Sequence, residues 1–204
     1  MKKAYINTLL LLAFAGTSHA ALVTGLDGIA DSSTMVSVAN WTAESGSIRS
    51  YTNVGGSTGM IHTNNSGAVF TAQYESIDLL LANTEYTMET RVGHWSSTDG
   101  SGATFTIDIG YVDGGTWTSL GQKSLQAPGT GEISPTANGV TDTLTFTTGD
   151  TVTGNVAVRV ARTNTEGRWA GFDYVTLDAA AVPEPSSATL LGLGGLALIL
   201  RRRK

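Results

Sequence analysis

Cysteine is absent from this 204-residue chain, and histidine occurs only three times. The first absence excludes disulfide bonds, a thiol nucleophile, and cysteine-based zinc and iron–sulfur sites. The one Gly-x-Ser-x-Gly match, at 55–59, lies in a glycine-rich turn of a chain without a sustained helical period, so it lacks the strand-to-helix context of an α/β-hydrolase nucleophile. We therefore expect a protein that is not an enzyme, without a resident cofactor.

Basic residues are also scarce in the middle of the chain. Between residues 21 and 182, six lysines and arginines stand against sixteen acidic residues, which gives a net charge of −10. A domain with this balance has no electrostatic basis for binding nucleic acid or anionic lipid. Both classes of partner are therefore excluded for the exported part of the chain.

The N-terminus has the features of a secretory signal peptide. Two lysines among the first three residues precede an apolar run at 9–16, and small residues lead up to Ala20. This order predicts a signal peptide over residues 1–20, cut by signal peptidase between Ala20 and Ala21. The apolar run is too short to span a bilayer.

The middle of the chain alternates apolar and polar residues with a period of two. The segment 103–111 places Phe105, Ile107 and Ile109 on one face, as expected for a half-buried strand. Asp113-Gly114 marks a hairpin turn. An all-β fold, an antiparallel β-sandwich or jelly roll over residues 21–181, follows from strands at such intervals. The further predicted strands cover 34–38, 47–52, 67–74, 85–95, 117–125, 140–148, 155–162 and 169–178.

Two stretches carry a resemblance to a known class of domain. The segment "LLLANTEYTMETRVGHW" at 79–95 and the segment "GRWAGFDYVTLD" at 167–178 resemble jelly-roll modules related to carbohydrate-binding domains. The resemblance covers about half of the exported domain. It implies the fold and leaves the activity open, because such folds host many unrelated functions.

The last 23 residues combine a rigid motif, an apolar segment and a basic end. Residues 188–200 are uncharged, and as a helix they would measure roughly 20 Å against a hydrocarbon core of about 30 Å. A short transmembrane helix is expected there, with the cations in the cytoplasm. The motif consists of Val182, Pro183, Glu184 and Pro185, and the basic stop consists of Arg201, Arg202, Arg203 and Lys204.

This tail, residues 182–204, resembles the PEP-CTERM sorting signal. The resemblance implies that an exosortase-type membrane enzyme recognises and cleaves the tail. It also implies export to the cell envelope, the outer surface or the extracellular matrix, after a transient stay in the inner membrane. A simple C-terminal anchor that is never cut has the same arrangement of apolar segment and cations.

Aromatic residues are the best candidates for binding a ligand. An exposed indole offers an apolar platform for a sugar ring, and a neighbouring guanidinium supplies planar donors. Trp95, Trp169 and Arg168 are therefore the predicted ligand-binding residues for a polysaccharide. Tryptophan also fills sandwich cores, which is the alternative interpretation for each one.

Calcium is the one metal for which the sequence offers ligands. Asp27, Asp99 and Asp113 lie at glycine-rich turns, where carboxylates and backbone carbonyls could bind the ion. Ordinary turn chemistry explains the same residues. The sequence thus predicts a non-catalytic surface protein that binds polysaccharide or has a structural role. The alternative is a carbohydrate-active enzyme with an acidic pair near Trp95 or Trp169.

Overall fold

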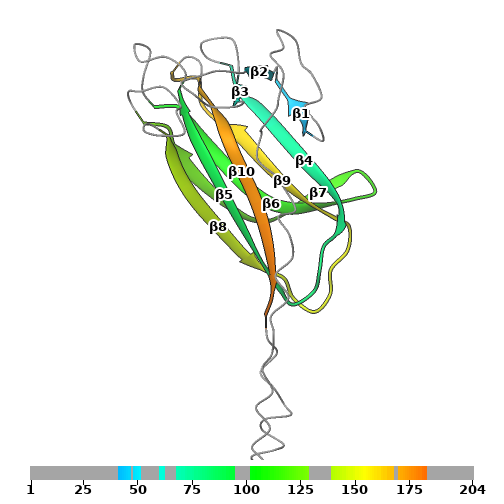
Figure 1. Ribbon diagram of the computed structural model, residues 1–204. Coiled ribbons are helices and arrows are strands. Elements are labelled where there is room, and N and C mark those ends of the chain that lie inside the picture. Colours follow the sequence, from blue (N-terminus) through cyan, green and yellow to red (C-terminus); the bar gives the residue numbers. More distant parts are fainter. Residues whose placement is uncertain are drawn as a thin grey trace, which may run out of the picture.

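The structure, a computed structural model, describes residues 41–46, 48–51, 60–62, 68–94, 102–128, 139–167 and 170–182. Within these ranges it contains ten strands and no helix (Figure 1). The strands are β1 (Trp41–Ser45), β2 (Arg49–Tyr51), β3 (Met60–His62), β4 (Phe70–Leu79), β5 (Thr84–His94), β6 (Thr104–Asp113), β7 (Thr116–Gln126), β8 (Val140–Thr147), β9 (Asn155–Arg162) and β10 (Ala170–Ala181).

The strands form two five-stranded sheets that pack face to face. One sheet, called here the β1–β7 sheet, has the order β1-β4-β9-β6-β7, and the other, the β2–β8 sheet, has the order β2-β3-β10-β5-β8. Every described strand pair is antiparallel. The predicted all-β antiparallel sandwich is therefore confirmed. The signal peptide and the apolar segment 188–200 lie outside the described residues.

The two-residue period explains why these segments are strands. In β6, Phe105, Ile107 and Ile109 are fully buried, while the polar residues between them, Thr106 and Asp108, are partly exposed. The predicted hairpin is present between β6 and β7, where Gly114 and Gly115 adopt φ values of 55° and 82°. Positive φ at both central residues matches the right-handed twist of the flanking strands, and glycine adopts it without strain.

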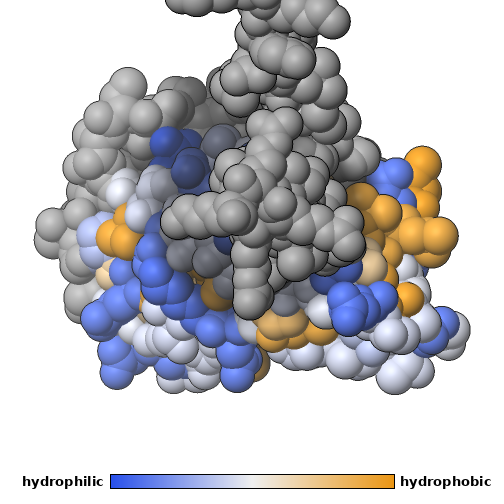
Figure 2. Space-filling view, turned by 90° about the horizontal axis from the view of Figure 1, so that it is seen from below, coloured by the Kyte–Doolittle hydropathy of each residue, from blue (hydrophilic) through white to orange (hydrophobic). Residues whose placement is uncertain are grey.

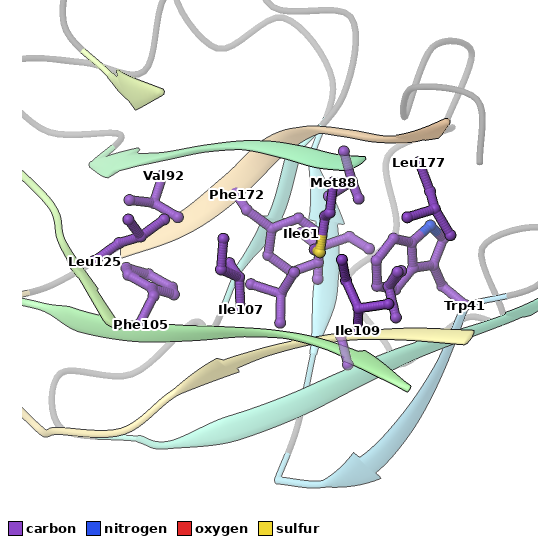
Figure 3. Close-up of a cluster of buried hydrophobic side chains, with 14 of the residues drawn as sticks. Trp41, Ile61, Met88, Val92, Phe105, Ile107, Ile109, Leu125, Phe172 and Leu177 are labelled. Carbon is purple, nitrogen blue, oxygen red and sulfur yellow. The ribbon is translucent and has the colours of Figure 1, made fainter. Parts of the chain in front are cut away.

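The core lies between the inner faces of the two sheets (Figure 3). Trp41 packs 5.1 Å from Phe172 and 5.6 Å from Tyr74, measured between ring centroids. Phe70 stacks on Phe172 of the opposite sheet at 6.2 Å and so links the sheets further. It also lies 6.3 Å from Phe105 of its own sheet in an edge-to-face arrangement. Edge-to-face aromatic pairs add to the stabilisation that burial provides. The alternative interpretation of tryptophan as core is correct for Trp41, which is 2% exposed.

One side of the sandwich is closed where the edge strands β7 and β8 meet. Lys123 of β7 reaches Asp142 of β8, with Nζ 2.6 Å from Oδ1, and it also donates to the carbonyl of Thr143 at 3.3 Å. Next to this bridge, a Cβ at Gly121 would lie 3.4 Å from the Phe146 ring, so the two strands are in close contact. The ion pair thus joins one sheet to the other.

Most predicted strands are present, and two were missed. The strand predicted at 67–74 begins at Phe70 and continues to Leu79, and β10 extends three residues beyond its predicted end at 178. The other described strands lie within two residues of their predicted ends. The missed strands are β1, with only two apolar residues, and β3, with three residues. Such short segments contain too few residues to establish a period. The strand predicted at 34–38 lies outside the described residues.

Candidate functional site

A row of polar side chains crosses the outer face of the β1–β7 sheet. Direct pairing aligns one residue from each strand, in the sheet order Thr42, Gln73, Arg159, Asp108 and Gln122. We call these five residues the polar row. Because side chains alternate along each strand, they share the face opposite the buried core residues. The row therefore places hydrogen-bonding groups across the full width of the sheet.

Arg159 lies at the centre of the row and holds its neighbours in place. Its Nε donates to Oε1 of Gln73 at 2.7 Å, and its Nη2 lies 3.5 Å from Oε2 of Glu44 on β1. Its guanidinium carbon lies 4.2 Å from the centroid of the Trp117 ring. Partial burial lowers the pKa of Arg159, whereas Glu44 and Asp108 raise it. An arginine remains charged under these influences, so the contact is a cation–π interaction.

Trp117 rests on the sheet where β6 has no side chain. A Cβ built on Gly110 would lie 2.6 Å from Cζ2 and 2.7 Å from Cη2 of the indole, so glycine is required at this position. The ring is partly exposed. One indole thus lies beside the guanidinium at the centre of the polar row, an arrangement that combines an apolar surface with directed hydrogen-bond donors.

A one-residue bulge in β7 turns Trp117 outward. Ile109 pairs with Gly121 and Gly110 pairs with Ser119, so Leu120 is the extra residue. Leu125 is buried, and strict alternation from it would place Trp117 on the inner face as well. The bulge reverses the alternation, as β-bulges at sheet edges commonly do. From the sequence, core filling was the favoured interpretation of Trp117, and Trp95 and Trp169 were preferred as ligand residues, because nothing in the residue pattern marks the bulge.

Asp108 is the acidic group of the row. Its Oδ1 accepts a hydrogen bond from Ser119 Oγ at 2.7 Å. Burial raises the pKa of this carboxyl, while the Ser119 hydrogen bond and the charge of Arg159 lower it. The group is consequently a hydrogen-bond acceptor with its geometry fixed from two strands. It can accept from a hydroxyl of a bound molecule through the oxygen that Ser119 leaves free.

The outer face of the β2–β8 sheet differs in composition. Thr141, Thr143, Thr145 and Thr147 of β8 are exposed, and they pair with Arg91, Glu89, Thr87 and Glu85 of β5. The alternation of threonine with apolar residues along β8 thus gives this face a row of exposed hydroxyls beside two acidic side chains.

An apolar pocket of about 310 Å³ opens at the end of the sandwich where β4 turns into β5. Tyr111, Leu120 and Phe146 contribute from the two sheets, and residues 148, 149 and 151–153 form its rim. Leu80, in the turn between β4 and β5, completes the lining of the pocket. Its lining contains no carboxylate, so it offers no acid–base pair for hydrolysis of a glycosidic bond.

The ligand residues predicted from the sequence fall outside the described residues. These are Trp95, Trp169 and Arg168. Their chain neighbours His94 and Ala170 are described, and these two pair across β5 and β10. The structure therefore leaves the three residues as predictions.

Of the predicted calcium ligands, only Asp113 is described. It is the exposed last residue of β6, next to the turn, while Asp27 and Asp99 lie outside the described residues. In the part of the chain that the structure describes, no three histidine or acidic side chains gather to form a metal site. Calcium binding therefore remains a prediction.

None of the described segments is a helix of the length and hydropathy needed to cross a membrane.

Comparison with known proteins identifies the tail. Residues 181–204 match the family described as the PEP-CTERM protein-sorting motif. The match covers the predicted motif, the apolar segment and the basic stop. The chain is thus exported and transiently anchored in the membrane, and its motif implies processing by an exosortase. No curated protein sequence matches the chain.

Solved structures with a similar fold include several carbohydrate-binding modules. The tandem family 22 modules of Paenibacillus barcinonensis Xyn10C align with a TM-score of 0.51 at 12% identity, over 86% of this chain and 49% of theirs. A family 16 module aligns at 0.48 with 14% identity, over 67% and 89%. A xylan-binding family 22 domain aligns at 0.47 with 16% identity, over 84% and 99%. This chain spans about half of the tandem structure. At these identities the likeness concerns the jelly-roll fold alone.

Proposed function

We propose that this chain is a non-catalytic polysaccharide-binding module of the cell surface or extracellular matrix. In this proposal an exosortase-type enzyme removes the tail and releases the sandwich outside the cell. The observation that carries the binding function is the partly exposed Trp117 beside Arg159 in the polar row. The jelly-roll fold shared with carbohydrate-binding modules supports the same assignment.

The chemistry of the polar row suits a sugar. A pyranose presents C–H groups on its faces and hydroxyls around its rim, and Trp117 can contact the former while Gln73, Asp108 and Arg159 bond to the latter. Arg159 is already balanced by Glu44 at 3.5 Å. Because the exported domain has a net charge of −10, we expect neutral polysaccharides to bind better than acidic ones.

The sequence-predicted residues Trp95, Trp169 and Arg168 belong to the proposal as a second contact region. Their described neighbours lie in the β2–β8 sheet, whereas the polar row lies on the β1–β7 sheet. Substitutions in the two regions therefore test two separate places on the domain. A polymer long enough to contact both would lose affinity in both sets of variants.

The test is a titration of the fragment 21–182 with neutral and acidic polysaccharides, followed by tryptophan fluorescence. We expect Trp117→Ala to weaken binding by about tenfold or more, since a central aromatic contact is typically worth over 1.4 kcal/mol. Arg159→Lys should also weaken it, because an ammonium loses the planar donor geometry. The matched control is Thr145→Ala on the outer face of the other sheet, which should bind normally.

Other outcomes separate the alternatives. If the panel gives no saturable binding, the module is structural. If reducing ends appear during incubation, the domain is an enzyme, and Asp108→Asn then tests the carboxyl of the row. Calcium is tested by repeating the titration with a chelator. Intact-mass measurement of the native protein tests the tail, because a mass that includes residues 186–204 would exclude its removal.

A further inference from the structure

Four of the five exposed large hydrophobic residues described lie at one end of the sandwich. Ile77 is 95% exposed, Leu79 66%, and Leu81 and Val182 40% each, while Val69 is the fifth. Single exposed hydrophobics are ordinary, but a group at one end of a soluble domain indicates a contact surface. Figure 2 looks at this end and shows hydrophobic residues gathered to one side of it.

Backbone hydrogen bonds hold this end together. Val182 N–H donates to the carbonyl of Asn83 at 2.9 Å, and Asn83 N–H donates to that of Gly149 at 3.2 Å. Leu80 N–H donates to the carbonyl of Gly154 at 3.0 Å. We define the tail pole as residues 77–83, 148–154 and 180–182. Because three chain segments are bonded to one another, the exposed hydrophobics are presented by a fixed surface.

The tail pole is where the chain leaves for the membrane. Only residues 183–187 separate Val182 from the uncharged segment 188–200. Five extended residues span at most about 17 Å. As long as the tail is inserted, the tail pole therefore stays next to the bilayer surface. A tether of this length gives a high effective concentration, so a weak apolar contact is sufficient.

The charges of the tail pole exclude attraction to anionic headgroups. Asp78 and Asp150 are its charged side chains, and its described segments contain no lysine or arginine. Contact must therefore come from Ile77, Leu79 and Leu81 entering the boundary between headgroups and acyl chains. Such contact is insensitive to salt, and acidic lipids weaken it.

We propose that the tail pole docks on the membrane surface while the protein is anchored, with the apolar side chains of 77–81 in the lipid interface. The occupant is a lipid surface, and polysaccharide binding is not required for it. In this position the sandwich stands on its end, and the polar row on the outer face of the β1–β7 sheet stays open to solvent.

The absence of cysteine makes the proposal directly measurable. The chain with its tail is reconstituted in phosphatidylcholine vesicles, with one cysteine introduced and labelled with an environment-sensitive fluorophore. Thr151→Cys places the probe on the tail pole without replacing a hydrophobic residue, and Thr145→Cys is the matched control on β8. Both threonines are exposed. Lipids carrying a quencher at the acyl-chain boundary should quench the probe at 151 and leave the probe at 145 bright.

A second variant tests the hydrophobic residues themselves. Replacing Ile77, Leu79 and Leu81 by serine should reduce the quenching at 151 to the level at 145, and should leave unfolding unchanged because all three are exposed. Equal quenching at 151 and 145 in the original chain would overturn the proposal. Quenching that persists in the serine variant would also overturn it, since the tether alone would then be responsible.

The processing enzyme is the competing partner for the same surface. If the probe at 151 is not quenched, yet the serine variant is cut more slowly in cells that process the tail, the surface contacts the enzyme and the lipid proposal is wrong. Salt and lipid charge give an independent check. Quenching at 151 should be unchanged by added salt in neutral vesicles and should decrease as acidic lipid is added.

Discussion

Replacing Gly110 by alanine should displace Trp117 and destabilise the domain. The new Cβ would lie 2.3 Å from the carbonyl oxygen of Thr118 and 2.6 Å from Cζ2 of the indole. The indole can rotate away, but the carbonyl belongs to the neighbouring strand β7, so β6 and β7 must separate locally. The substitution therefore weakens the pairing of β6 with β7 and displaces the indole of Trp117 from its position above residue 110.

The size of the effect follows from three contributions. Overpacking of this kind costs about 1–3 kcal/mol. Loss of the contact between Arg159 and Trp117 adds about 0.5–1 kcal/mol. The lower conformational entropy of alanine in the unfolded chain returns about 0.4–1 kcal/mol. We expect a net loss of about 1–3 kcal/mol, or roughly 2–12 °C in Tm for a domain of this size.

Thermal unfolding of the 21–182 fragment, followed by circular dichroism and tryptophan fluorescence, measures this loss. Gly149→Ala is the matched control, since a Cβ there meets nothing within 4 Å. In a Trp117→Ala background, Gly110→Ala should cost less, because only the clash with the carbonyl remains. A Gly110→Ala variant as stable as Gly149→Ala, with unchanged fluorescence, would refute the description of this site.

Three further substitutions test the structure elsewhere. Arg162→Met removes a guanidinium that is 1% exposed and donates to two backbone carbonyls, so urea unfolding should show a loss of about 2–4 kcal/mol. Tyr86→Phe removes the hydroxyl that accepts a hydrogen bond from the Leu81 N–H at 2.8 Å, and the same assay should show a loss of about 1–2 kcal/mol in unfolding free energy. An unchanged unfolding free energy would mean that water replaces the hydroxyl as acceptor. Lys123→Ala should cost less than about 1 kcal/mol at pH 7, because both partners are partly exposed to solvent. The hydrogen bond from Lys123 lowers the pKa of the Asp142 carboxyl in the folded protein. The pair therefore stabilises the fold at a pH above the carboxyl's unfolded-state pKa of about 3.9. This stabilisation is lost as the pH falls through the lower pKa of the folded state. Unfolding at pH 7 and at about pH 2 should therefore show a difference between Lys123→Ala and the original chain only at the higher pH.

The strands were predictable because burial repeats along the sequence. Along 103–111 every second residue is apolar, and the structure buries Phe105, Ile107 and Ile109 between the sheets. The hairpin at Asp113 was predictable from turn chemistry, since its two glycines adopt positive φ. Local physics was sufficient for these features.

The candidate site depends on register, which the sequence does not reveal. Gln73 and Arg159 are bonded although they are 86 residues apart in the chain. Asp108 and Arg159 were each recognisable as polar residues on alternating strands, but only the order of β4, β9 and β6 makes them neighbours. Trp117 faces outward because of one extra residue in β7. Long-range pairing and a bulge together decide the site.

The position of β10 determines how the domain responds to mechanical force. This strand continues directly into the tail, and it lies inside its sheet, paired with β3 on one side and with β5 at eleven positions on the other. A pull on the tail acts along the strand, whereas its hydrogen bonds run across it. The bonds are therefore loaded together in shear instead of opening one after another. While its C-terminus is held at the membrane, the domain can in this way resist extraction by a force that acts on the β1–β7 sheet.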